Sequence, residues 1–355
     1  DIFVEVSHGP TLIDHNILLS DRALKIATQG VALVHNLICG GFVSVGIGTD
    51  NGAPDIPSPR YTPYHTKHGT QVAGFMTILH GDDKFYNNIF VQKPIRPCMQ
   101  ELADLMGGNG NMWDDCNVLT GTFRFNGYPT FEEWNRQFEG YCGMGSETTG
   151  NCYYDHLPVW ASGNLYFNGA CAWEKETDAV TDAEHTVDIS VEKKEDGWYL
   201  KTNLYDIIKE ETDGIISTET LGMAFEPEQK YENPDGSPII FNQDFFGNHR
   251  DVKTVAGPFT DKKAAEQKRR GHKIRPSRTV SVRCCSASGN RRVVGCADRN
   301  AAENAQNARA AVYFLRRHHG GHHHADRVSR RARRGKDDIN ERKKALSFVR
   351  ECLLR

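Results

Sequence analysis

LIDHNILLS (residues 12–20) and ALVHNLICG (residues 32–40) share the pattern that decides the fold. In both segments an Asn stands between a short apolar run and two further apolar residues. These residues, Asn16 and Asn36, are 20 positions apart, and internal repeats of about 20 residues are typical of solenoid proteins. The pair therefore predicts two successive coils of a solenoid.

Further copies of the pattern occur along the chain. KFYNNIFVQ (residues 84–92) repeats it at Asn88, and weaker copies stand at Asn117 and Asn164. Their spacing is longer and uneven, which indicates long loops inserted between coils. Short strands with apolar residues at every second position, joined by bends that contain Asn, are typical of a parallel β-helix.

The predicted fold is therefore all-β, a right-handed parallel β-helix in which each repeated Asn occupies an equivalent bend. Asn tolerates left-handed backbone and forms local hydrogen bonds. When it is stacked on its copy in the next coil, it can extend a ladder of side-chain amides. The repeat alone leaves open a second interpretation, a set of ordinary strands that end in Asn.

The regions between the repeats carry turn and loop signals. Residues 40–83 are expected to form long loops, because four prolines up to Pro63 exclude regular structure. Thr130 is a candidate N-cap for a short helix. Residues 188–204 predict a C-terminal β-hairpin, since alternating apolar residues flank the turn dipeptide Asp196-Gly197.

The charge distribution divides the chain into two parts. Residues 261–355 contain 26 Lys and Arg against 9 Asp and Glu, a net charge of +17, whereas residues 1–260 have a net charge of −20. We expect residues 1–260 to form the β-helix domain and residues 261–355 to be a poorly ordered basic tail, encoded natively or in a shifted reading frame. Nucleic-acid binding by the tail is an alternative, but no known binding motif occurs in it.

The remaining bulk features limit the cellular context. No stretch of about 20 apolar residues predicts a membrane span, and no signal peptide opens the chain. The ten cysteines have neither metal-site nor disulfide-framework spacing, so reduced thiols are expected. The chain begins at Asp1 without an initiator Met, which predicts a fragment of a longer protein. Reduced thiols favour the bacterial cytoplasm, while a periplasmic or secreted location stays open.

FVEVSHGP (residues 3–10) places the carboxylate of Glu5 within an apolar, strand-like run. Side chains alternate between the two faces of a strand, so Val4 and Val6 are expected inside the coil, and Phe3 and Glu5 outside. An outward carboxylate with an aromatic neighbour suits a groove for a linear sugar chain. A solvated surface Glu is the alternative.

Several motifs occur in an order that resembles one known family. FVEVSHGP, LIDHNILLS, HNLICG, RYTPYH (60–65) and GDDKFYNNIFV (81–91) resemble the later part of the catalytic β-helix of glycoside hydrolase family 120, the β-xylosidases. TLGMAFEPEQKYENPDGSPIIFNQDFFG (220–247) resembles the end of the same domain. The resemblance covers about residues 1–259, and nothing after Thr260 contributes to it.

The resemblance implies a retaining hydrolase that releases xylose from β-1,4-xylo-oligosaccharides. Such an enzyme needs two carboxyl groups about 5–5.5 Å apart, a nucleophile and a general acid/base. By the motif match Glu5 is the acid/base. The family's nucleophile is an Asp about one coil upstream, so the chain is expected to lack it and to be inactive alone.

The resemblance implies that Arg60, Tyr64 and His65 of RYTPYH line the sugar subsite. His8, which follows Glu5 at the strand end, could hydrogen-bond a sugar hydroxyl or orient Glu5, and Asp83 is a further candidate substrate contact. The Tyr64 ring is a candidate platform for the C–H face of a sugar ring. Asp82 and Asp83 could bind sugar hydroxyls or a cation, or form a solvated turn, and a turn or loop-anchoring role is the alternative for the others. No metal site or cofactor is predicted, although a structural calcium ion stays open. Xylo-oligosaccharides are the expected partner, with no nucleic acid or membrane and an undetermined oligomeric state.

The sequence leaves two other functions open. A β-helix polysaccharide lyase would act on anionic uronic-acid polymers, which the net charge of −20 on residues 1–260 disfavours. A non-catalytic carbohydrate-binding β-helix is the other alternative, because the predicted nucleophile is missing.

Overall fold

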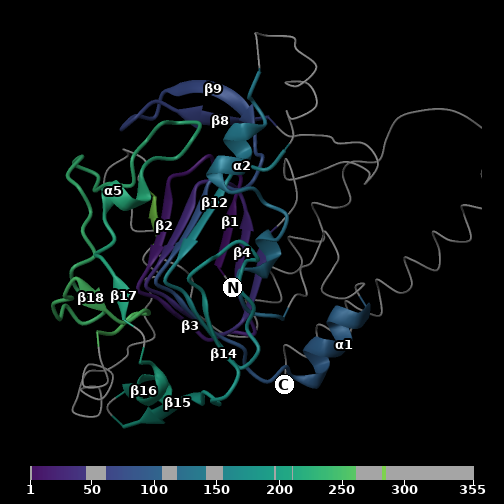
Figure 1. Cartoon of the computed structure of the whole chain (residues 1–355), viewed down its shortest axis with the longest axis vertical. Helices are drawn as coiled ribbons and strands as arrows, with labels where there is room; N and C mark the ends of the chain where they lie inside the picture. Colours follow the sequence, from purple (N-terminus) through teal and green to yellow (C-terminus); the bar gives the residue numbers. More distant parts are fainter. Residues whose placement is uncertain are drawn as a thin grey trace, which may run out of the picture.

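The computed structural model describes residues 2–44, 61–105, 118–140, 155–195, 197–209, 211–260 and 282–284. Three mainly parallel sheets dominate the described part of the chain (Figure 1). The first has the order β1 (Ile2–Glu5), β4 (Arg22–Ala27) and β7 (Gly41–Ser44). The second has the order β12 (Val159–Ser162), β10 (Asp83–Tyr86), β5 (Val31–Val34), β2 (Thr11–Asp14) and β19 (Val282–Cys284). The third has the order β14 (Val180–Asp182), β13 (Leu165–Phe167), β11 (Ile89–Val91), β6 (Leu37–Ile38) and β3 (Ile17–Leu18).

Consecutive strands of one sequence repeat join different sheets. Strands β1, β2 and β3 follow one another in the chain, and each pairs in parallel with its counterpart about one repeat later, in β4, β5 and β6. Strand β19 is the exception in the second sheet, because it pairs with β2 in antiparallel orientation. The parallel pairing confirms that Asn16 and Asn36 lie in equivalent places, and it is consistent with the predicted parallel β-helix.

Alternation along the strands builds the apolar interior. Ile13, Leu33 and Phe85 occupy matching positions of β2, β5 and β10, and all three are fully buried. They belong to one large cluster that also contains Ile26, Phe42, Phe90 and Tyr166 from other parts of the fold. Burying side chains of this size contributes about 1.5–3 kcal/mol each. The predicted every-second-residue pattern therefore supplies the main stabilisation of the coils.

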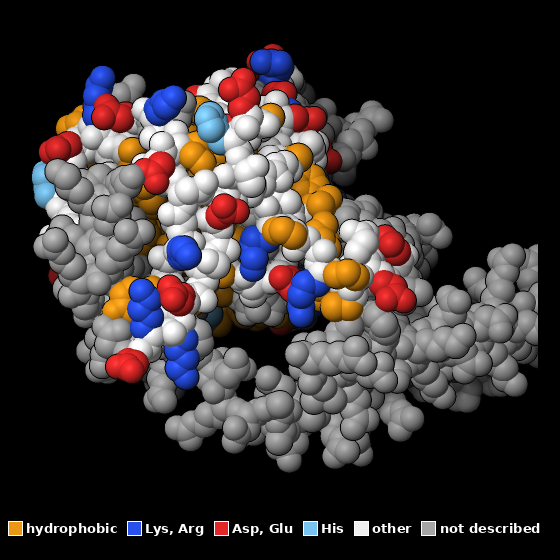
Figure 2. Space-filling view, turned by 90° about the horizontal axis from the view of Figure 1, so that it is seen from below, with side chains coloured by type: hydrophobic (Ala, Val, Ile, Leu, Met, Phe, Trp, Pro, Cys, Tyr) orange, Lys and Arg blue, Asp and Glu red, His pale blue; other side chains and the backbone are white. Residues whose placement is uncertain are grey.

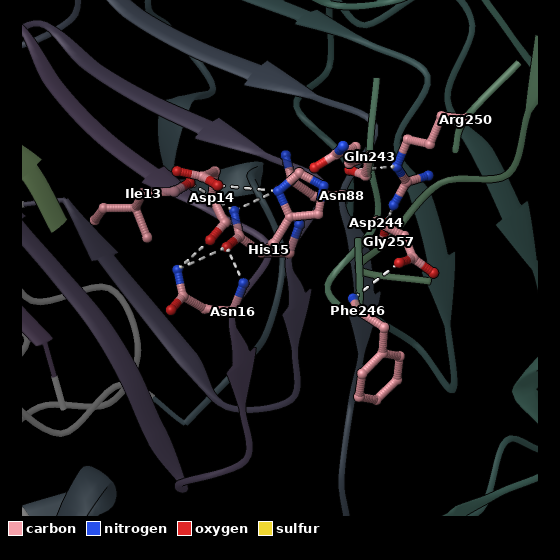
Figure 3. Close-up of polar contacts among 11 residues, drawn as sticks. Ile13, Asp14, His15, Asn16, Asn88, Gln243, Asp244, Phe246, Arg250 and Gly257 are labelled. Carbon is pink, nitrogen blue, oxygen red and sulfur yellow. Dashed lines mark hydrogen bonds and ion pairs between the residues drawn. The ribbon is translucent and has the colours of Figure 1, made fainter. Parts of the chain in front are cut away.

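The repeated asparagines form the predicted ladder. The Asn16 side-chain amide donates to Asn36 Oδ1 at 3.2 Å, Asn36 to Asn88 Oδ1 at 2.9 Å, and Asn88 to Asn164 Oδ1 at 3.0 Å. Each of these oxygens also accepts the backbone N–H of the preceding ladder member. Figure 3 shows the near end of this ladder, with Asn16 and Asn88 beside the β2 strand. Asn117 lies outside the described residues.

Left-handed backbone occurs one residue earlier than expected. The residues before the ladder asparagines, His15, His35, Asn87 and Gly163, have φ values of 52°, 56°, 55° and 67°. The prediction that Asn itself adopts this conformation was wrong. Each Asn instead uses its side-chain amide to donate to a carbonyl, as Asn36 does to Ile13 at 2.9 Å, which leaves the turn geometry to its neighbour.

Glu176 ends the ladder. Its Oε1 accepts from the Asn164 side-chain amide at 2.8 Å, and its Oε2 accepts from the Tyr166 hydroxyl at 2.7 Å. Burial raises the pKa of Glu176 from 4.5 to about 7, although the hydrogen bonds from Tyr166 and Asn164 act in the opposite direction. The folded chain thus holds this proton more tightly than the unfolded chain does.

The Glu176 pKa predicts a pH-dependent stability. The stabilisation is fully present below about pH 4.5 and is lost as the pH rises towards 7, by about 3 kcal/mol. Glu176→Gln keeps an oxygen that can accept from Asn164 and removes the titration. We expect urea unfolding at pH 4.5 and pH 8 to show this loss in the wild type and not in the variant. Glu139→Gln, at an exposed position, should retain it, and an unchanged loss in the Glu176→Gln variant would contradict the assignment.

Smaller elements surround the sheets. The described helices are α1 (Pro97–Leu105), the 3-10 helix η3 (Phe123–Phe125), α2 (Phe131–Arg136), α4 (Leu204–Ile207) and α5 (Thr218–Leu221). The antiparallel hairpins are β8 (Tyr61–His65) with β9 (Val72–Thr77) and β15 (Ile189–Lys194) with β16 (Gly197–Thr202). Two distant short strands, β17 (Thr212–Asp213) and β18 (Lys253–Thr254), also pair in antiparallel orientation. In Figure 1 the β8–β9 hairpin and α2 lie at one end of the sheets and β15–β16 at the other.

Two local predictions are confirmed and one is wrong. Thr130 caps α2 through a capping box with Glu133, and residues 189–202 form the predicted hairpin. Pro63 was expected to exclude regular structure, but it lies within β8 opposite Phe75. Proline is tolerated there because, among the described residues, β8 pairs with β9 alone and has a second, free edge, where a missing N–H breaks no ladder.

The segment after β16 covers the outer face of the second sheet. Ile216, Leu221, Tyr231, Ile239 and Phe241 pack on Leu12, Ala32 and Val34. Arg250, which is almost fully buried, donates to the carbonyls of Val255 at 3.1 Å and Gly257 at 2.7 Å, and Figure 3 shows its guanidinium beside Gln243 and Gly257. Residues 220–247, which resemble the end of the family's catalytic domain, thus contribute to the packing against the second sheet.

Interspersed charge, free thiols and the absence of membrane-spanning helices characterise the described residues. Acidic and basic side chains are interspersed on the face seen in Figure 2. Within the described ranges no helix is long and apolar enough to cross a membrane. Cys39, Cys98 and Cys171 are free thiols, and burial raises the pKa of Cys39 to about 12. Apart from β19, the predicted basic tail lies outside the residues that the structure describes.

Candidate functional site

Strand β1 places Glu5 on the outer surface, as its alternation predicts. Ile2 and Val4 pack against the core cluster, whereas Phe3 and Glu5 are exposed. Lys25, on the neighbouring strand β4, lies with its Nζ 5.0 Å from the centroid of the Phe3 ring. Glu5 itself is the last residue of β1 and pairs with Ala27 of β4. The carboxylate therefore stands at the point where the chain leaves the first sheet.

The turn from β1 to β2 is built for close packing. Val6 has a φ of 53°, which bends the chain directly after Glu5, where it leaves the first sheet. Gly9 has a φ of 73°, and a Cβ there would lie 2.6 Å from the carbonyl oxygen of Gly30 in the next coil. Only glycine allows both this conformation and this approach. The turn therefore has a fixed shape, and its exposed side forms one wall of a pocket.

The pocket has a volume of about 390 Å³ and three walls. The first wall is the turn of residues 6–11, the second is the tip of the β8–β9 hairpin at residues 63–70, and the third is formed by Pro227 and Gln229. A pocket of this size is in the range of small-ligand sites, about 300–1,000 Å³. Glu5 precedes the first lining residue, Val6, and is not itself part of the wall.

His8 connects the turn to the hairpin. Its side chain is 3% exposed, its Nε2 lies 3.1 Å from the carbonyl oxygen of Thr62, and its ring meets the Tyr64 ring edge-on at 5.8 Å. Burial lowers the pKa of His8, against a smaller opposing effect of the Thr62 and Met76 carbonyls. At neutral pH the ring is therefore uncharged, and as donor to Thr62 it carries its proton on Nε2. This contact holds the second wall against the first.

A polar network closes the pocket between the hairpin tip and the third wall. His68 Nε2 lies 2.8 Å from Glu232 Oε1, and the Gln229 side-chain amide donates to the same oxygen at 2.8 Å. The backbone N–H of His68 donates in turn to Gln229 Oε1 at 2.9 Å. Segments separated by 161 residues in the sequence are thus joined at the pocket mouth.

The structure brings only some of the predicted residues together. His8, Tyr64 and His65 line the pocket, and Arg60 lies outside the described residues. Asp83 is fully buried, and its Oδ1 accepts from the Val31 N–H at 2.9 Å. Burial raises the Asp83 pKa well above its ordinary value. Asp83 is therefore held in the sheet interior instead of at the pocket surface, because it occupies an inward position of β10.

Asp82 is also a structural residue in this arrangement. Its carboxylate contacts the Lys84 ammonium and accepts from the Phe225 N–H at 2.8 Å. Burial raises its pKa, and the neighbouring Lys84 opposes the rise. The pair joins β10 to the segment that leads into the third wall. Within the described ranges no group of three or more His, Cys, Asp or Glu side chains is arranged to hold a metal ion.

His68, Pro227 and Gln229 are among the pocket residues that the sequence analysis did not identify. Pro227 and Gln229 belong to the TLGMAFEPEQ run, which marked the family resemblance but carried no predicted role. His68 lies three residues after RYTPYH. Their proximity to FVEVSHGP depends on the folding of distant segments, so nothing in the local sequence indicates it.

Comparisons with known proteins give one match. No model of a known protein family matches the chain, and no curated protein matches it either. Among solved structures, the chain is similar to XylC in its complex with xylose, at 30% sequence identity and a TM-score of 0.57. The match covers 73% of this chain and 35% of XylC, so the chain spans about a third of the length of that protein. This similarity supports a relation between the chain and glycoside hydrolase family 120.

Proposed function

We propose that the chain is part of a retaining β-xylosidase that releases xylose from β-1,4-xylo-oligosaccharides, built on a right-handed parallel β-helix. One observation carries the proposal, namely the similarity over 73% of the chain to XylC, a protein solved with xylose. The pocket beside the β1–β2 turn supports it, because it adjoins the outward carboxylate of Glu5.

Glu5 is the proposed general acid/base. In a retaining glycosidase one carboxylate attacks the anomeric carbon, and the other protonates the departing oxygen and then activates water. Adjacent strands of a sheet lie about 4.8 Å apart, close to the separation of about 5–5.5 Å that this mechanism needs. A carboxylate on a strand that pairs with the free edge of β1 would therefore be a suitably placed nucleophile. The described residues supply no such strand.

Sugar recognition is proposed for the pocket walls. Tyr64 offers an aromatic ring edge-on to His8, and His65 and Gln229 add polar groups to the lining. A few placed polar groups on a largely apolar wall are typical of small-ligand sites. Arg60 stays a predicted contact. Asp83 is proposed to stabilise the position of β10 and not to contact the sugar, because it is fully buried and its Oδ1 accepts the Val31 N–H.

Replacement of Tyr64 tests the proposed pocket. Tyr64→Ala removes an aromatic wall, which should weaken xylose binding about tenfold, since one aromatic contact contributes about 0.5–1.5 kcal/mol. Tyr61→Ala is a matched control, because Tyr61 lies on the same strand, is 57% exposed and does not line the pocket. Xylose titration followed by NMR would measure both. Equal weakening in the two variants, or none in Tyr64→Ala, would refute the role of the pocket.

A non-catalytic sugar-binding module is the second candidate. The length comparison favours it for the chain by itself, because the chain spans about a third of XylC. The two candidates differ in the role of Glu5, which a binding module does not need for affinity. Turnover by a longer protein that contains this sequence therefore separates them.

A further inference from the structure

Four aromatic side chains contact one another in a series that ends two residues from the pocket wall. Phe131 and Trp134 come from α2, Trp160 from β12, and Phe225 from the segment that leads into the third pocket wall. We call Phe131, Trp134, Trp160 and Phe225 the aromatic platform. None of the four lines the pocket itself, and the proposed function assigns no role to them.

The rings of the platform contact one another in series. The Phe131 centroid lies 6.1 Å from Trp160 and 6.3 Å from Trp134, with interplanar angles of 27° and 25°. Trp134 in turn lies 5.4 Å from Phe225, at 82°. Neighbouring centroids are thus separated by a distance similar to the length of one pyranose residue. Phe131 stacks on both tryptophans, and Lys84 Nζ lies 4.6 Å from the centroid of the Trp160 ring. The rings with the most free surface for the C–H groups of a sugar are therefore those of Phe131 and Phe225.

The two phenylalanines of the platform are exposed and its two tryptophans are half-buried, although the backbone that carries them is fixed. Phe131 is 45% exposed and Phe225 is 47% exposed. The Thr130–Glu133 capping box fixes the start of α2, and Lys175 donates to Glu133 Oε2 at 2.7 Å. The Phe225 backbone is fixed by its hydrogen bond to the buried Asp82. A cluster of exposed aromatic side chains on a fixed framework is typical of a binding surface. A ligand that covers the rings removes apolar area from water, and little entropy is lost because the rings are already ordered.

We propose that the aromatic platform binds further pyranose units of an uncharged β-linked oligosaccharide whose terminal xylosyl unit occupies the pocket. This inference rests on the proposed function. Phe225 of the platform and Pro227 of the pocket wall lie two residues apart in the same segment, so this segment leads from one to the other. The net charge of −20 on residues 1–260 favours a neutral chain over an anionic polymer.

The test compares a short and a long sugar by titration calorimetry with the full 355-residue chain. The wild type should bind xylotetraose at least about tenfold more tightly than xylose, as one or more stacked rings would contribute. The double variant Phe131→Ser/Phe225→Ser should lose this difference and keep its affinity for xylose. Phe75→Ser, at a 62% exposed position outside the platform and the pocket, should behave as the wild type does.

Other results would overturn the inference and distinguish it from the proposed function. Equal affinity of the wild type for both sugars, or a double variant that keeps the preference for xylotetraose, refutes the platform while xylose binding upholds the pocket. Binding of neither sugar by the wild type refutes both. If sedimentation shows that the double variant loses self-association while sugar preference is unchanged, the platform is a contact between copies of the chain. Thermal unfolding of each variant confirms that it is folded.

Discussion

Asn88→Ala is expected to lower the free energy of unfolding by about 4 kcal/mol, a large fraction of the 5–15 kcal/mol typical of a domain. The Asn88 side chain makes four hydrogen bonds, to Leu33, to Asn164 and twice to Asn36. Removing it leaves the N–H of Asn36 without a partner in a fully buried place. An unsatisfied buried donor costs about 1–3 kcal/mol, and the lost amide adds a cavity.

Asn16→Ala is the matched control for this prediction. Asn16 stands at the end of the ladder, is partly buried and accepts no hydrogen bond from a further Asn among the described residues. Water can replace the two bonds that its amide donates, so we expect a loss of about 1 kcal/mol. Urea denaturation of both variants gives the comparison. If Asn88→Ala were no more destabilising than Asn16→Ala, the ladder would not be a cooperative stabilising element.

Glu5→Gln is expected to reduce xylobiose hydrolysis by about 10²–10⁴-fold in a longer protein that contains this sequence together with the nucleophile. General acid catalysis contributes about 10²–10⁴-fold, and a sugar leaving group needs its proton. An activated aryl xyloside needs little protonation, so its first step should survive and the glycosyl-enzyme should accumulate. Azide should then restore release, because it attacks without a general base. The isolated 355-residue chain should not hydrolyse either substrate.

The control for Glu5→Gln uses a neighbour on the same strand. Phe3 is exposed on the same face of β1, so Phe3→Leu changes the groove without removing a carboxylate. Azide should therefore not increase the rate of the Phe3→Leu variant. Steady-state rates on xylobiose and on an aryl xyloside, with and without azide, make the measurement. Intact xylobiose turnover in Glu5→Gln would show that Glu5 is a solvated strand residue and that the acid/base lies elsewhere.

The repeat pattern was sufficient to predict the parallel strands and the amide ladder. Both depend on local regularities, an apolar residue at every second position and an Asn at each bend, and these recur in the sequence itself. The same holds for the α2 cap at Thr130 and the hairpin at residues 189–202, whose signals lie within a few residues of each other. The position of Pro63 in a strand was missed because its edge pairing depends on a partner strand that begins only at Val72.

The sequence by itself determined which residues repeat, which strand faces are apolar and that Glu5 points outward, because strand alternation and coil stacking are short-range properties. Only the tertiary structure decided that Asp83 is buried with its carboxylate bonded to the Val31 N–H, and that His8 contacts the β8–β9 hairpin at the Thr62 carbonyl. It also decided that residues 227–232 close a pocket begun by residues 6–11. These outcomes depend on contacts between segments more than 50 residues apart, whose relative placement is fixed only when the sheets pack.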